Sequence, residues 1–174
     1  THREKTPVGS ARAVNESVTG FSSNRHNAGF LLSEPGAGQT HGRVYGFNLV
    51  WSGNHYASAQ CSKQGITRVM QGISPAHFAR IIAPGGSFET PEAVMSFSGE
   101  GFNGLSAHMH DFVNRHIVPE RWQERERPVL YNSWEGCGFD FTERRLLELA
   151  KKAAKLGCEL FVLDDGWFGA RNDD

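Results

Sequence analysis

The sequence predicts a multidomain fragment, an all-β sandwich followed by the first βαβ unit of a (β/α)8 TIM barrel. The apolar run at residues 159–163 is typical of a strand that is covered on both faces in a parallel sheet. An amphipathic helix pattern precedes this run, and a second apolar run at residues 128–131 precedes the helix. The residues before 127 instead contain short alternating runs between glycine-rich turns, which is typical of a sandwich.

The composition indicates a folded protein that has no electrostatic attraction to polyanions. The chain has 174 residues, of which 39% are hydrophobic and 21% charged, and its formal net charge is -1. A net charge near zero gives no basic surface for nucleic acid or for an anionic membrane. No apolar stretch approaches the length of a membrane span. We therefore expect no nucleic-acid partner and no membrane partner.

The three cysteines, Cys61, Cys137 and Cys158, are widely spaced. This spacing fits neither a disulfide framework nor a zinc site, and it favours a reducing compartment, so we expect a cytoplasmic protein. Small buried or half-buried thiols are the simplest interpretation of all three. We also expect no cofactor.

Six short segments of the first part have strand-like patterns between turns. They are residues 29–32, 43–51, 55–61, 66–73, 78–82 and 92–97. In the second segment the larger side chains of Tyr45, Phe47, Leu49 and Trp51 alternate with other residues and so share one face. The turn signal at residues 52–54 predicts that the second and third segments pair as a hairpin.

The hydrophobic period changes from Asn103 onward and predicts a helix that ends before Pro119. The strongly charged residues 120–127 follow and mark a domain boundary. The expected parts are a β sandwich at 1–102, a linking helix and boundary at 103–127, and the incomplete start of the barrel at 128–174.

The helix of the second part has clear end signals. Asp140 and Glu143 have the spacing of a capping box, with Asp140 as the expected N-cap. The apolar residues that follow lie on one helical face, and Gly157 suits the position just after the helix. The order strand, helix, strand predicts a βαβ unit with parallel strands.

Asp164 and Asp165 stand at the end of the second predicted barrel strand, with Trp167 beside them. Ligand-binding residues of α/β barrels gather at this end of the strands. Three interpretations are open: an N-cap in a tight Asp-Gly turn, ligands of a divalent metal, and acceptors for sugar hydroxyls. We favour the sugar, because carboxylates accept hydroxyl hydrogen bonds and an indole covers the apolar face of a sugar ring. The next residues offer no further metal ligand, so we expect no metal.

A second cluster of the same kind follows the first barrel strand. Trp134 could form one wall of a sugar pocket, and Asn132 or Glu135 could hydrogen-bond to the ligand or brace the loop. A structural role for Trp134 is equally compatible with the spacing. An aromatic residue and an acid at two successive strand ends favour the functional interpretation.

Three segments of the second part resemble the glycoside hydrolases of family 36, which are mostly microbial α-galactosidases. These segments are residues 128–135, 139–143 and 160–169. Three earlier segments are similar to the end of that family's N-terminal β-sandwich domain: residues 25–27, 41–50 and 91–94. The resemblance spans nearly the whole chain, and it implies that the sandwich at 1–102 is the C-terminal part of this domain.

The resemblance implies retaining hydrolysis of terminal non-reducing α-D-galactose in oligosaccharides such as raffinose and melibiose. In the family the nucleophile and the acid/base Asp lie on later barrel strands, so we expect both downstream of Asp174 and expect this chain alone to be inactive. Asp164 and Asp165 match the family's galactose-binding pair, and Trp134 matches a tryptophan of the same pocket. The resemblance also implies a homo-oligomer at full length.

Two kinds of alternative function remain open at this point. One is a non-catalytic galactose-binding or assembly module. The other is a related α-N-acetylgalactosaminidase or galactosyltransferase activity. Residues 136–138 depart from the usual residues of the family, which leaves the contacts of this loop open.

Overall fold

The structure is a computed structural model that describes residues 4–22 and 25–170. Its contacts divide the chain into two compact units, Thr1–Asn114 and Arg115–Asp174. Within the described part of the chain, no helix is both long and apolar enough to cross a membrane.

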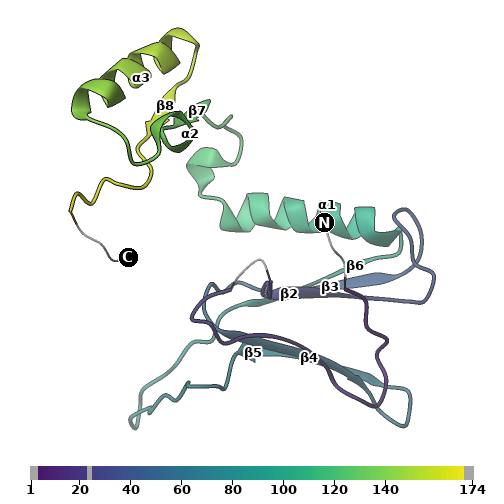
Figure 1. Ribbon diagram of the computed structural model, residues 1–174. Helices are drawn as coiled ribbons and strands as arrows, with labels where there is room; N and C mark the ends of the chain where they lie inside the picture. Colours follow the sequence, from purple (N-terminus) through teal and green to yellow (C-terminus); the bar gives the residue numbers. More distant parts are fainter. Residues whose placement is uncertain (1–3, 23–24, 171–174) are drawn as a thin grey trace. The chain divides into compact units, whose positions relative to one another are not determined.

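The first unit contains two antiparallel sheets of three strands each and the helix α1 (Gly101–Phe112) (Figure 1). One sheet has the order β1-β4-β5, formed by Ala13–Ser17, His55–Cys61 and Thr67–Ile73. The other has the order β2-β3-β6, formed by Gly29–Ser33, Val44–Leu49 and Ala93–Ser98. The β2-β3-β6 sheet lies between α1 and the β1-β4-β5 sheet (Figure 1). The first unit therefore has the layered β architecture that the sequence predicts.

The predicted hairpin between β3 and β4 is wrong. β3 pairs with β2 and β6, whereas β4 pairs with β1 and β5, so residues 50–54 lead from one sheet to the other. The Trp51 indole folds back in this connection, where its Nε1 donates to the Asn54 carbonyl at 3.0 Å. A Cβ on Gly53 would lie 2.8 Å from the same indole nitrogen. The connection is a compact corner between sheets because the indole packs inside it.

β3 has the two faces that its alternating sequence predicts. Tyr45 and Phe47 share one face, on which the Tyr45 ring lies 4.9 Å from the Phe97 ring of β6. Gly46 lies on the opposite face, where a Cβ would be 3.1 Å from a methyl group of Leu105 in α1. Leu105 is only 2% exposed. A glycine at this position therefore lets the helix approach the sheet closely.

The first turn of α1 is capped by a loop of the same unit. The backbone N–H groups of Gly101, Phe102 and Asn103 donate to carbonyls of residues 38–42, at 2.9 to 3.1 Å. Gly101 has a φ of +76°, and a side chain there would collide with the Gly38 carbonyl. The loop satisfies the first N–H groups of the helix, which has no side-chain cap.

The helix predicted from Asn103 to Pro119 is present, with differences at both ends. It begins two residues earlier, at Gly101, and its continuation Val113–Ile117 has π-helical hydrogen bonds. A 3-10 turn at Glu120–Trp122 follows in the charged segment. The apolar spacing therefore predicts the helix, but not the wider last turn.

The strand predicted at residues 78–82 is absent, and this segment belongs to a long loop between β5 and β6. Ile81 is 96% exposed. The Phe78 ring lies 5.8 Å from the Phe88 ring, and the Arg80 guanidinium lies 5.7 Å from the same ring. The run has the composition of a strand, but in the described part of the chain no strand pairs with it, so its side chains cluster locally.

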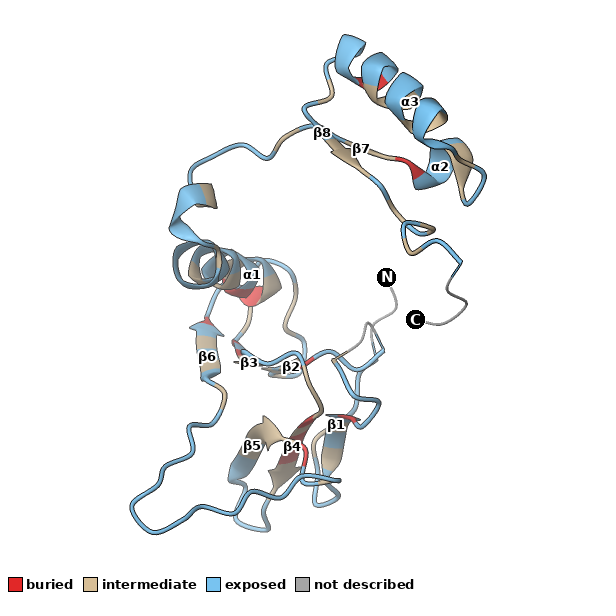
Figure 2. Ribbon diagram, turned by 90° about the vertical axis from the view of Figure 1, so that its left-hand side faces the viewer, coloured by how far each residue is buried: buried red, intermediate tan, exposed pale blue. Residues whose placement is uncertain are grey.

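The buried residues of the β1-β4-β5 sheet concentrate on β4 (Figure 2). His55 is fully buried there, and neither ring nitrogen has a hydrogen-bond partner within the described residues. Burial lowers the pKa of His55 below its ordinary value of 6.5. The nearby His26 lowers this pKa further, whereas Glu16 raises it. The folded protein therefore favours the neutral imidazole.

We expect His55 to make the first unit less stable in acid. Its pKa is lower in the folded chain than in the unfolded chain, so protons favour the unfolded state below about pH 6.5. The stability is intact above that pH and declines as the pH falls toward the folded-state pKa. The melting temperature should therefore fall more between about pH 7.5 and pH 5 in the wild type than in His55→Gln. The same decrease in both proteins would contradict this role of the buried imidazole.

The second unit contains the predicted order strand, helix, strand. β7 (Leu130–Asn132) and β8 (Leu160–Val162) pair in parallel, and α3 (Glu143–Lys155) connects them (Figure 1). A short helix, α2 (Trp134–Cys137), follows β7 directly. Each strand has three residues, so both are shorter than the apolar runs that predict them.

The predicted N-cap of α3 is wrong by two residues. Thr142 precedes the first helical residue with an extended backbone, and its hydroxyl accepts from the Arg145 backbone N–H at 3.3 Å. Asp140 instead binds the Arg145 side chain, with Oδ2 at 2.6 Å from Nη1. Both residues have side chains that can cap a helix, and the spacing of the sequence does not distinguish them.

Candidate functional site

The parallel pairing of β7 and β8 brings two strand ends together. The Ser133 N–H continues the ladder beyond β7 and donates to the Val162 carbonyl at 3.0 Å. The residues that follow each strand therefore lie next to each other. This edge of the second unit carries both clusters that the sequence predicts, at residues 132–135 and 163–167.

Asn132 connects the two clusters with its side chain. Its Nδ2 donates to Asp164 Oδ2 at 2.6 Å, and its Oδ1 accepts from the Trp134 backbone N–H at 2.8 Å. The Asn132 amide thus donates to the residues that follow β8 and accepts from the residues that follow β7. Of the two roles that the sequence left open for Asn132, the structure shows the brace.

Asp164 is held at its backbone and at both carboxylate oxygens. Its N–H donates to Ser133 Oγ at 3.1 Å, and Ser133 is buried. Its Oδ1 accepts from the Asp165 N–H at 2.8 Å, while Oδ2 accepts from Asn132. These bonds fix the position of the turn after β8.

Asp165 differs from Asp164 in its surroundings. It is exposed, and within the described residues no hydrogen bond or ion pair involves its carboxylate. An ionised carboxylate has two acceptor oxygens and can bind two hydroxyl groups. Asp165 is therefore the acidic group at this edge that is best placed to accept bonds from a ligand.

Two indoles accompany the carboxylates. Trp134 is 38% exposed, and the edge of one ring faces Phe139, with the centroids 4.9 Å apart. Trp167 is 66% exposed and lies 5.8 Å from the Phe168 ring. Both indoles thus keep accessible apolar surface, as a wall for a sugar ring requires.

Gly166 permits the turn that follows Asp165. Its φ of +96° favours glycine, and a Cβ would lie 2.9 Å from the Phe141 ring and 3.3 Å from the Phe139 ring. The turn therefore packs on aromatic residues of the loop before α3. Sequence reasoning missed this contact, and the glycine after two aspartates is the signal that could have indicated it.

The structure does not support a helix cap at the aspartate pair. Residues 165–170 form turns, so Asp164 and Asp165 precede no helix in the described part of the chain. As for a metal, residues 4–22 and 25–170 contain no group of three or more His, Cys, Asp or Glu arranged to hold an ion. Acceptors for hydroxyl groups are the interpretation that the geometry suits best.

An apolar groove of about 450 Å³ lies beside α3 and β8. Leu146, Ala150 and Phe161 contribute to its lining. A sugar site needs convergent polar groups on an aromatic wall, and this groove is lined mainly by apolar side chains. The strand-end edge is therefore the better candidate for a ligand site.

Two family models match the chain: Melibiase over residues 87–174, and the glycosyl hydrolase family 36 N-terminal domain over residues 1–82. Alpha-galactosidase AgaA of Geobacillus stearothermophilus is 42% identical over 171 residues, which are 98% of this chain and 24% of that protein. The crystal structure of the family 36 α-galactosidase AgaB from the same organism has a TM-score of 0.90 at 42% identity, covering 98% of this chain and 24% of the other. An AgaA variant in complex with raffinose has a TM-score of 0.90 at 41% identity, with the same coverage.

These matches define the class of protein as a glycoside hydrolase: one family model lies within the first unit, and the other includes the whole second unit. The chain belongs to glycoside hydrolase family 36. It contains a mostly β part that matches the family's N-terminal domain and the start of the catalytic domain. The chain spans about a quarter of the length of the relatives named here.

Proposed function

We propose that this chain is part of an α-galactosidase that hydrolyses terminal α-linked galactose with retention of configuration. The relatives that match nearly all of the chain are named α-galactosidases. One of them is an enzyme variant whose structure contains raffinose, an oligosaccharide with a terminal galactose. Galacto-oligosaccharides of the raffinose and melibiose type are therefore the proposed substrates.

In this proposal β7, α3 and β8 are the first βαβ unit of a (β/α)8 barrel. Ligands of such barrels bind at the C-terminal ends of the strands, where Asp164, Asp165 and Trp134 stand. The observation that carries the assignment is the 2.6 Å hydrogen bond from Asn132 to Asp164, which joins the two strand-end clusters. Asp165 then accepts sugar hydroxyls, and Trp134 covers the C–H face of the ring.

The aspartate pair binds the sugar in this proposal and does not perform the bond exchange. A retaining glycosidase needs two carboxyl groups on opposite sides of the glycosidic bond. Asp164 and Asp165 are adjacent in the chain, and Asp164 already accepts two internal hydrogen bonds. We therefore assign the nucleophile and the acid/base to other strands of the barrel, outside these 174 residues.

The cytoplasm is the proposed compartment. All three cysteines are free and half-buried. Thiols that remain free are typical of a reducing environment. Fractionation of cells that produce the protein would test this, and enrichment outside the cytoplasm would contradict it.

The proposed activity is tested with the full-length protein that contains this sequence. We expect hydrolysis of an aryl α-galactoside and of raffinose, but little hydrolysis of the aryl α-glucoside, which differs at one hydroxyl. Residues 1–174 expressed alone should show no turnover, because the two reacting carboxylates are assigned elsewhere. No α-galactoside hydrolysis by the full-length protein would overturn the proposed function. Turnover by homogeneous 1–174 would overturn the placement of the catalytic pair.

A further inference from the structure

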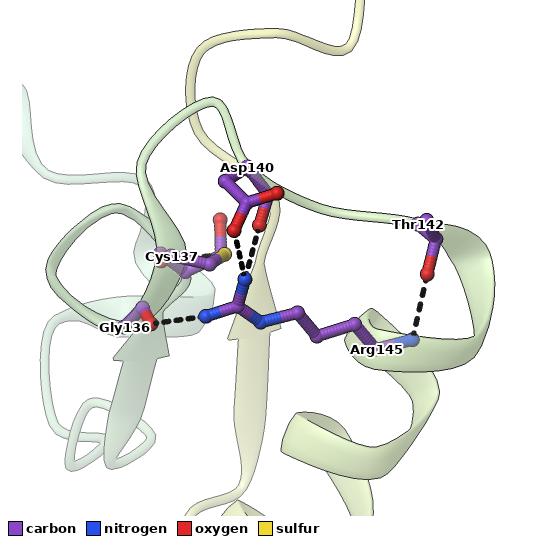
Figure 3. Close-up of polar contacts among 6 residues, drawn as sticks. Gly136, Cys137, Asp140, Thr142 and Arg145 are labelled. Atoms are coloured by element: carbon purple, nitrogen blue, oxygen red, sulfur yellow. Dashed lines mark hydrogen bonds and ion pairs between the residues drawn. The ribbon is translucent and has the colours of Figure 1, made fainter.

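One arginine of α3 binds Gly136 in α2 and Asp140 in the loop between α2 and α3. Arg145 Nη1 donates to the Asp140 carbonyl and to Asp140 Oδ2, at 2.6 Å each, and Nη2 donates to the Gly136 carbonyl at 3.4 Å (Figure 3). Its backbone N–H donates to the Thr142 hydroxyl, which anchors the arginine in the first turn of α3. A guanidinium can make such a bridge because its donors form a planar fork.

Phe139, between these two bound residues, contacts residues of the proposed sugar site. Phe139 lies directly before Asp140, and its ring contacts Trp134 at a centroid distance of 4.9 Å. Phe139 and Phe141 also pack on Gly166, next to Asp165. The loop therefore touches both halves of the site, the indole after β7 and the turn after β8.

Polar contacts inside the loop do not replace the arginine. Cys137 Sγ donates to the Ser133 carbonyl at 3.2 Å, and the Cys137 carbonyl accepts from the Asp140 N–H at 2.9 Å. These bonds join residues 133–140 to one another and do not reach α3. In the described structure, Arg145 is the α3 residue whose side chain donates hydrogen bonds to residues 136–140.

We infer that Arg145 is a positioning residue, which holds Phe139 against Trp134 and the Asp165 turn so that the indole is in place when galactose binds. This inference rests on the proposed function. Arg145 and Asp140 need not touch the sugar, since they act through the aromatic ring between them. Loss of the Arg145 contacts with Gly136 and Asp140 should therefore weaken galactose binding and leave the chemical step nearly unchanged.

The test compares Arg145→Gln with Arg144→Gln in the full-length enzyme. Arg144 is the neighbour on the same helix, with a 91% exposed side chain that forms an ion pair with the Glu148 carboxylate at 3.9 Å. We expect Arg145→Gln to raise KM for the aryl α-galactoside and the galactose Ki about fivefold, with kcat within about twofold. Arg144→Gln should change none of these constants. Arg145→Lys should restore only part of the affinity, because an ammonium group lacks the fork.

A double-mutant cycle shows whether Arg145 acts through the ring. In a Phe139→Ala background, Arg145→Gln should have little further effect on KM. Should Arg145→Gln fail to fold, Asp140→Asn removes the carboxylate charge that faces Arg145, at a site whose side chain is 94% exposed, and a smaller rise in KM is expected. Unchanged KM and Ki in all these variants, or equal losses in kcat, would overturn the inference. An inactive wild type would instead refute the proposed function, so the two failures are distinguishable.

Discussion

The Asp165→Asn variant of the full-length enzyme is expected to lose most of its activity on α-galactosides without losing stability. A charge-assisted hydrogen bond contributes about 1.5–3 kcal/mol, so loss of one or two should lower kcat/KM about tenfold to a hundredfold. The galactose Ki should rise together with this loss. The melting temperature should stay nearly constant, because the Asp165 side chain is exposed and its carboxylate has no partner within the described residues.

Asp164→Asn should behave differently, and the difference tests the roles of the two residues. The Asp164 carboxylate accepts from Asn132 on one oxygen and from the Asp165 N–H on the other. An amide has a single acceptor oxygen, so one of these bonds is lost, at a cost of about 1 kcal/mol. We expect lower stability as well as weaker galactose binding. Kinetics, galactose inhibition and melting curves of both variants check this, and a stability loss in Asp165→Asn with unchanged galactose affinity would refute the assignment.

Trp134→Ala should raise KM for α-galactosides about tenfold or more, since the variant loses the proposed wall of the sugar site. The indole is 38% exposed and meets Phe139 edge-on, so its removal deletes a ring surface and a ring contact together. Trp134→Phe keeps a ring at this position and serves as the matched control. It should retain most of the affinity. Equal KM values for the alanine variant and the wild type would leave Trp134 with a structural role only.

The second unit could be predicted well because each of its elements carries a local signal. The amphipathic spacing predicts α3, and the apolar runs on both sides predict the parallel strands. The two strand-end clusters were recognised for the same reason, since position after a strand is visible in the sequence. The N-cap at Thr142 was missed because Asp140 has an equally suitable side chain.

The first unit was harder to predict because its pairing is not local. β3 and β4 are separated by a short turn, yet they belong to different sheets, because the packed Trp51 indole forms a corner that the turn signal does not indicate. The run at residues 78–82 resembles a strand but is a loop. The sequence of β1, AVNES, does not predict a strand because it consists largely of polar or small residues. In these segments, tertiary contacts override the secondary structure that the local sequence favours.

The contacts of Arg145 with Gly136 and Asp140 could not be predicted for a related reason. A basic residue early in an amphipathic helix is normally expected on the solvent-exposed face. Arg144, which precedes Arg145, does lie on that face. Only the backbone path of residues 136–140 brings two carbonyls and a carboxylate to the Arg145 guanidinium. The sequence therefore predicts the residues of the site more readily than those that position them.

Titration calorimetry of the full-length protein with galactose and with glucose tests the central claim most directly. We expect galactose to bind the wild type and glucose to bind much more weakly. Asp165→Asn should lower the galactose affinity about tenfold or more, as expected for a lost charge-assisted bond. Galactose affinity that is the same in Asp165→Asn and the wild type would show that the strand-end edge of β7 and β8 is not the galactose site.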